Sequence, residues 1–112
     1  PMTSPRKARE RAFHAQQGYC CYCGYPMIAS ADNIDEFARL HNLKKRGAGP
    51  LLATAEHLQA RCEGGKNTAA NIVAAHLLCN RRRHRRTSAP TPENYRQLVQ
   101  RRCARGGWHP PE

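Results

Sequence analysis

The sequence is poor in the large apolar side chains that normally fill a protein core. Leu, Ile, Val and Phe together number 15 of 112 residues, whereas 16 residues are alanine. A share of about 13%, combined with a high net charge, is in the range typical of disordered chains. Two interpretations remain: a disordered basic protein, or a single small domain over residues 1–112 that something other than apolar burial stabilises.

Long apolar runs and acidic residues are also scarce. No stretch is long enough to span a membrane, and the polar, basic N-terminus predicts no secretory signal. We therefore expect a cytoplasmic protein, in which clustered cysteines indicate metal binding rather than disulfides. Eight acidic residues stand against 19 basic ones, 15 of them arginine, and the net charge of +11 favours a polyanion as partner.

Six cysteines are present, and two pairs of side chains have the spacing of a structural zinc site. A C-x-x-C pair is followed directly by Gly24, which relaxes the tight turn, and an H-x-x-C pair later in the chain completes a tetrahedral set. The predicted ligands are Cys20, Cys23, His76 and Cys79. Zinc would supply folding energy that the core lacks. Cys21 or Cys62 in place of the histidine is the alternative, and Cys103 is expected on a helix face.

Three helices are predicted outside the central motifs, at residues 6–17, 32–46 and 92–105. The first and last begin after a Ser-Pro and a Thr-Pro pair, which are typical helix starts. Asp32 is the expected cap of the middle helix, and Trp108 is expected to pack back on the body. The basic residues of the first helix suit either a solvated face or a second phosphate contact.

Strand signals lie between these helices and make the chain α+β. Residues 51–60 and 71–75 are predicted as antiparallel strands, separated by a loop that contains a Gly-Gly pair. Residues 76–86 are predicted to begin as a zinc knuckle and to continue as a helix. The domain core is therefore expected over about residues 19–86, with the middle helix as an insert.

A second group of metal-binding side chains lies on the first strand and the following helix. Glu56 and His57 are adjacent, so they point to opposite sides of the strand. Asn80 and His84 are four residues apart and share a helix face. We expect Glu56 and Asn80 to bind a hard cation such as Mg²⁺ or Mn²⁺, while His84 extends the choice to transition metals. His57, on the other side, can take a proton from water.

A run of arginines surrounds the second half of this helix. Guanidinium groups bind phosphate oxygens in a bidentate manner and carry little sequence information when they do so. We predict that this run holds a nucleic-acid backbone, and a solvated helix face is the alternative. The residues are Arg81, Arg82, Arg83, Arg85 and Arg86.

The pattern Glu56-His57, Asn71 and Asn80-x-x-x-His84, flanked by the two zinc pairs, resembles the HNH endonuclease family. The resemblance implies a ββα-metal fold. It also implies that His57 is the general base, and that Asn71 braces the two strands and helps to orient the base. Glu56 and Asn80 are implied to bind the catalytic metal, and His84 to be a metal ligand or a phosphate contact.

The resemblance covers residues 19–24 and 55–86, and two positions depart from the family pattern. Glu56 stands where aspartate is usual, and His76 replaces the more usual cysteine of the second knuckle. The implied activity is that of a metal-dependent DNA endonuclease or nickase that acts on duplex DNA as a monomer or weak dimer. Two alternatives keep the zinc site without the chemistry: a nucleic-acid-binding module, and a structural or protein-interaction zinc domain.

Overall fold

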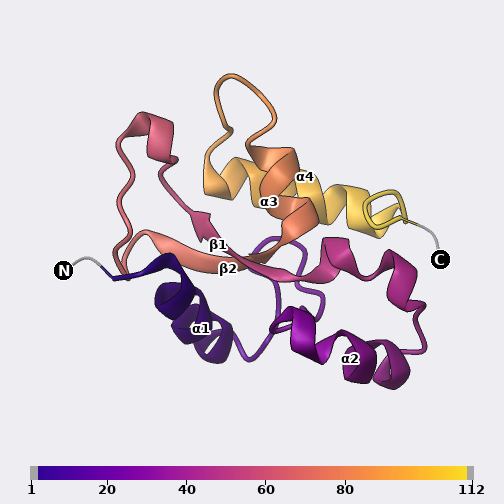
Figure 1. The fold of residues 1–112 in the computed structure, drawn as a ribbon. Helices are drawn as coiled ribbons and strands as arrows, with labels where there is room; N and C mark the ends of the chain where they lie inside the picture. The colour runs from indigo at the N-terminus through magenta and orange to yellow at the C-terminus, as the bar shows by residue number, and fades with distance from the viewer. Residues whose placement is uncertain (1–2, 111–112) are drawn as a thin grey trace.

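The computed structural model describes residues 3–110 and shows a small α+β fold (Figure 1). At its centre is an antiparallel pair of strands, in which Ala53 pairs with His76 and His57 pairs with Ile72. The strands are β1 (Ala53–His57) and β2 (Ile72–His76). The four α-helices of the described residues are α1 (Pro5–Ala15), α2 (Ile34–Leu40), α3 (Leu77–Arg83) and α4 (Pro92–Ala104). Short 3₁₀ turns cover Ala31–Asn33, Lys45–Gly47, Gly49–Leu51 and Arg61–Glu63.

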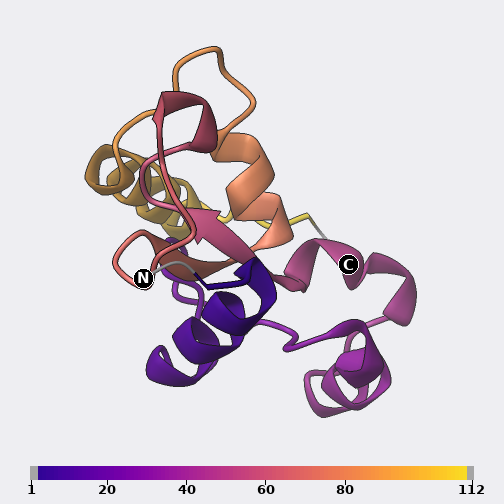
Figure 2. The same ribbon diagram turned by 60° about the vertical axis from the view of Figure 1, so that its left-hand side comes forward.

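The helices are divided between the two sides of the small sheet. Helix α1 packs against both strands on one side, while α3 leaves directly from the end of β2 and lies with α4 on the other (Figures 1 and 2). The segment that contains α2 sits beside the sheet. None of the helices within residues 3–110 has the length and apolar character that crossing a membrane requires.

The predicted helix starts are confirmed for the first and last helices. Ser4 Oγ accepts a hydrogen bond of 3.2 Å from the amide of Lys7, and Thr91 Oγ1 accepts one of 3.2 Å from the amide of Asn94. In both cases proline occupies the first helical turn, where its missing N–H costs nothing. Asp32 does not have the predicted capping role, because it lies in a 3₁₀ turn ahead of α2.

The helix predicted over residues 32–46 is shorter than expected. It ends at Leu40 because Asn42 adopts a left-handed conformation with φ of 55°, which stops helical propagation. The amide of Leu43 then donates to the carbonyl of Ala38 at 2.7 Å. This is the Schellman arrangement of a helix C-terminus, in which asparagine can take the place of glycine.

Strand β1 and the arginine-bearing helix are also shorter than predicted, whereas β2 keeps its predicted length and is shifted by one residue. Strand β1 stops at His57, and the chain then forms a tight loop in which Gly65 lies against the carbonyl of Gln59. A Cβ atom at Gly65 would come within 1.7 Å of that oxygen, so the loop requires glycine there. Helix α3 ends at Arg83, three residues before the predicted boundary.

The interior contains few large aliphatic side chains, as the composition predicted. Ala53, Ala74 and Ala75 are the buried alanines that the sheet contributes to the core, and Trp108 packs back onto the body as expected, with 2% of its surface exposed. The cysteines of the predicted zinc site belong to the same buried cluster. The packing of this cluster therefore depends on the interaction that holds the cysteine sulfurs together.

Candidate metal centre and candidate active site

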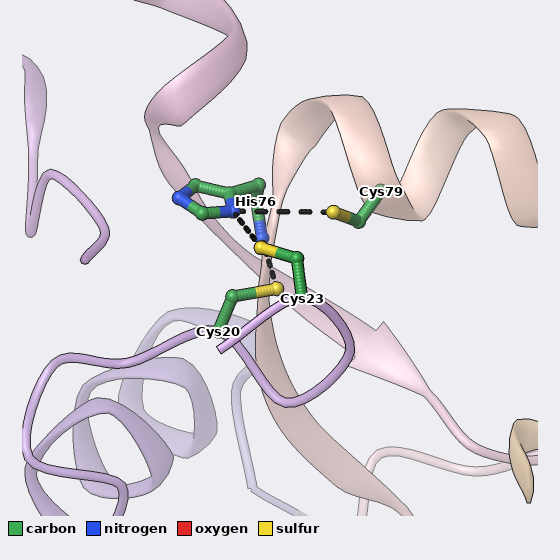
Figure 3. Close-up of side chains that lie close together, drawn as sticks. All are labelled: Cys20, Cys23, His76 and Cys79. Atoms are coloured by element: carbon green, nitrogen blue, oxygen red, sulfur yellow. Dashed lines mark hydrogen bonds between the residues drawn. The ribbon is translucent and has the colours of Figure 1, made fainter. Parts of the chain in front are cut away.

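The four predicted zinc ligands come together in one buried group (Figure 3). Their ligand atoms all lie within 4.8 Å of one another. His76 Nδ1 is 3.2 Å from Cys23 Sγ and 3.9 Å from Cys79 Sγ. Donors bound tetrahedrally at ~2.1–2.3 Å from zinc would be ~3.5–3.8 Å apart. The group, completed by Cys20, therefore fits a structural zinc ion.

Surrounding groups hold each ligand in the orientation that a metal requires. His76 Nε2–H donates to the carbonyl of Pro26 at 2.7 Å, which leaves Nδ1 with its lone pair toward the sulfurs. Two backbone amides approach Cys20 Sγ at 3.4 and 3.5 Å, and Trp108 Nε1–H donates to Cys79 Sγ at 3.3 Å. Such bonds favour the thiolate form, which is the form that binds metal.

The sulfur atoms are too close for all of them to ionise without a cation. The pKa of Cys20 is lowered because the thiols of Cys21, Cys23 and Cys79 donate to its sulfur. The pKa of Cys79 is raised, mainly because its thiol is hydrogen-bonded to Cys20 and Cys23. A divalent ion removes this conflict by replacing the shared protons. Neither Cys21 nor the exposed Cys62 belongs to the four-residue group, so the alternative ligand sets find no support.

Glu56 is the centre of the second polar cluster. Its side chain is fully buried and faces α3, as expected. Oε2 accepts hydrogen bonds from the hydroxyl of Tyr22 at 2.7 Å and from Arg83 Nη1 at 3.2 Å. Oε1 lies 2.7 Å from Nε2 of His84, whose side chain is 27% exposed. One carboxylate oxygen is therefore held from the interior, while the other meets a group that reaches solvent.

Arg83 does not have the position predicted for it in a phosphate-binding surface. Its side chain is only 3% exposed and forms an ion pair with Glu56. The guanidinium also donates to the carbonyls of His57, Leu58 and Pro90, at 2.9, 2.8 and 3.0 Å. A helix places every third or fourth residue on its inner face, and position 83 falls there. In this structure Arg83 joins α3 to the end of β1.

Asn80 lies in α3, one turn before His84, which follows the last residue of that helix, and also faces β1. Its Nδ2 donates to Thr54 Oγ1 at 3.1 Å and to the carbonyl of Ala55 at 3.3 Å. Among the described residues no group donates to its Oδ1. The amide oxygen of Asn80, which the sequence analysis predicts to bind metal, therefore has no donor among the described residues, while the amide nitrogen fixes the side chain to the strand that carries Glu56.

His57 points away from Glu56 and into the loop that follows β1. Asn67 Oδ1 lies 2.7 Å from its Nε2, and Arg61 Nε lies 3.2 Å from the same nitrogen. Nε2 can donate or accept but not both, so only one of these contacts is a full hydrogen bond in a given tautomer. The imidazole is held in a polar loop rather than in an apolar interior.

Asn71 joins two parts of the loop that connects β1 to β2. Its Oδ1 accepts from the amide of Gln59 at 2.7 Å, and its Nδ2 donates to the carbonyls of Gln59 and Lys66, at 3.1 and 3.0 Å. It therefore braces the chain on both sides of the loop. It does not touch His57 directly among these contacts; Asn67 does.

Three members of the arginine run line a cleft of about 450 Å³ between α3, α4 and the C-terminal segment. Arg82 donates to the carbonyl of Trp108 at 2.6 Å and lies 4.6 Å above its ring. Arg102 of α4 adds a further positive charge that the sequence did not associate with this surface. Arg81 is exposed outside the cleft. The cleft arginines are Arg82, Arg85, Arg86 and Arg102.

Three residues of these clusters were not predicted from the sequence. Tyr22 lies between two zinc ligands, and that position was the available signal that it contacts a site. Asn67 belongs to a polar loop without periodicity, so nothing singled it out. Arg102 lies in the helix predicted over residues 92–105, away from the arginine run in the sequence, and only the position of α4 beside α3 brings it to the other arginines.

Comparison of the chain with protein-family models, curated proteins and solved structures found no match.

Proposed function

We propose that the protein is a metal-dependent DNA endonuclease or nickase of the HNH type. The observation that carries the proposal is the approach of Glu56 Oε1 and His84 Nε2 to 2.7 Å, with Asn80 on the same helix face. A carboxylate, an imidazole and a free amide oxygen are then offered by one strand and one helix. This is the ligand chemistry of Mg²⁺, Mn²⁺ or a transition metal.

The distance between Glu56 Oε1 and His84 Nε2 would suit a bound ion after little rearrangement. Two ligands bound at right angles, ~2.1 Å from an octahedral ion, lie about 3.0 Å apart. Glu56 Oε1 and His84 Nε2 would need to separate by only a few tenths of an ångström. Since Oε2 has its own donors in Tyr22 and Arg83, the carboxylate would keep its place while Oε1 changes partner.

In the proposed reaction, the cation would bind on one side of β1, and His57 would act as general base on the other side. When bound, the cation supplies positive charge for a phosphate oxygen and for the leaving 3′ oxygen. His57 accepts the proton of the attacking water through whichever ring nitrogen is unprotonated, and such general-base help contributes roughly 10²–10⁴-fold in rate. Asn67 and Asn71 hold the loop in which the imidazole lies. The cleft arginines hold the DNA backbone without reading its sequence.

Cleavage of supercoiled plasmid in Mg²⁺ or Mn²⁺ tests the enzymatic part. We expect the zinc-loaded chain to nick or cut the plasmid, and His57→Ala to lose at least about 100-fold in rate while it still binds DNA. His41→Ala is the matched control, because it removes an exposed imidazole that directly follows α2. Equal cleavage by wild type and His57→Ala would contradict the assigned base.

Salt-dependent binding tests the role of the arginine cleft. Arg85→Gln/Arg102→Gln removes two charges from the cleft, and Arg101→Gln/Arg105→Gln removes two exposed charges of the α4 region that lie outside it. The first pair should lower the slope of log Kd against log salt by about 2, and the second should leave it nearly unchanged. Equal slopes in the two variants would show that the cleft is not the binding surface.

A non-catalytic nucleic-acid-binding module is the second candidate, and one observation favours it. Glu56 is completely buried and both of its oxygens are hydrogen-bonded, as in a purely structural ion pair. Under this candidate, the plasmid stays intact in every divalent metal. The arginine variants would behave as above in either case, so the cleavage assay separates the two functions.

A further inference from the structure

The side chain of Tyr22 connects the zinc group to the Glu56 cluster. Tyr22 lies between Cys20 and Cys23 in the sequence and is fully buried. Its hydroxyl donates to Glu56 Oε2 at 2.7 Å. The ring packs edge-on against Tyr95, with centroids 4.9 Å apart, and the guanidinium of Arg96 lies 6.0 Å from its centroid. Arg96 in turn donates to the carbonyl of Cys21 at 3.0 Å. The phenol therefore has little freedom to move.

The two oxygens of Glu56 are held in different ways. Oε2 receives two donors, from Tyr22 and Arg83, both of which are buried. Oε1 meets only His84, which is partly exposed. Two donors on one oxygen restrict rotation of the carboxylate plane, a torsion that is otherwise broad. The second oxygen is consequently presented in one direction.

We propose that Tyr22 is a positioning residue for the catalytic metal: held in the zinc-binding loop, its hydroxyl fixes Glu56 Oε2 so that Oε1 is presented to a divalent cation beside His84. The inference rests on the proposed nuclease function and adds a direct link between the structural ion and the catalytic one. Partners that orient a metal ligand typically change metal affinity or activity by about 10–100-fold when they are removed.

A pair of Tyr→Phe substitutions tests this link. Tyr22→Phe keeps the buried ring and removes only the hydroxyl that reaches Glu56. Tyr95→Phe is the matched control, because it removes an equally buried hydroxyl that donates instead to the carbonyl of Cys79, at 2.6 Å. Mn²⁺ binding is measured from the paramagnetic resonance signal of the free ion, and plasmid nicking is measured against Mn²⁺ concentration. Zinc content and circular dichroism are recorded for each variant.

We expect Tyr22→Phe to retain zinc and to need about 10-fold more Mn²⁺ for half-maximal binding and nicking. Its rate should recover at high Mn²⁺, whereas Tyr95→Phe should have the Mn²⁺ dependence of wild type. An unchanged dependence in Tyr22→Phe overturns the inference, and so does loss of zinc, because Tyr22 then serves the structural site. Wild-type protein that neither binds Mn²⁺ beyond its zinc site nor nicks DNA would instead remove the proposed function itself.

Discussion

The zinc group and the Glu56 cluster are neighbouring buried sites of four polar side chains, and they differ in how their charge is balanced. The zinc group has three thiols and an imidazole directed at one another, with no cationic side chain among them. The Glu56 cluster contains its own cation, since Arg83 is paired with the carboxylate. The first site therefore fits a bound metal ion such as zinc, whereas the charges of the second are already paired within the chain.

Removal of zinc should have the largest effect and should act on the first site. Chelation, or Cys23→Ser, removes binding free energy that in zinc-dependent peptides is ~10–16 kcal/mol, as large as the whole stability of a small domain. We expect the helical circular dichroism and the cooperative thermal transition to disappear. Cys62→Ser is the control, since this exposed cysteine lies outside the zinc group.

The zinc prediction would be contradicted by metal-free protein with an unchanged spectrum and melting temperature. The apolar core would then be sufficient, and the contrast between the two sites would vanish. Loss of structure in Cys62→Ser as well would show that the group of zinc ligands is different from the one in the structure.

Arg83→Met should have the next largest effect and breaks the charge balance of the second site. Removing one partner of a buried ion pair leaves an uncompensated charge and costs about 3–5 kcal/mol. Thermal or urea unfolding measures this loss. Arg81→Met, an exposed change in the same helix, should lie within about 0.5 kcal/mol of wild type.

A paired substitution sharpens the difference between the sites. Replacing both partners of a buried ion pair is often nearly neutral, so Arg83→Met/Glu56→Gln should recover much of the stability that Arg83→Met loses. Replacing two of the zinc ligands together should not recover stability in this way. If the double variant is no more stable than the single one, the cost arises from the carbonyl partners of Arg83 and not from Glu56.

The sequence predicted the zinc group better than the second cluster, for a physical reason. Ligand spacing in C-x-x-C and H-x-x-C pairs is set by local turns, so Cys20, Cys23, His76 and Cys79 were identified without knowledge of tertiary structure. Arg83 was assigned to the surface because all members of the arginine run look alike. Its burial depends on how α3 packs against β1, which a local pattern does not encode.

The fold shows the same difference between local features, which the sequence predicts, and long-range packing, which it does not. The caps at Ser4 and Thr91, the antiparallel strand pair and the α+β class were predictable, since each depends on residues close in the sequence. The early end of α2 was missed because the stop signal is Asn42 in a left-handed conformation rather than glycine. The cleft that contains Arg102 required the docking of α4, which joins residues distant in the chain.

His84→Ala should have the smallest effect on stability. It should also distinguish most clearly between a role of this cluster in metal binding and a role in folding alone. Its side chain is 27% exposed, so its contact with Glu56 is partly screened and should contribute no more than about 1 kcal/mol to folding. If the pair serves metal binding, cleavage should nevertheless fall by roughly 10–100-fold, as it does when partners of metal sites are removed. His41→Ala again provides the control, and stability and plasmid cleavage are measured on the same preparations. A stable, fully active His84→Ala would leave Glu56 as a structural ion-pair partner only, and the two buried sites would then both belong to the fold.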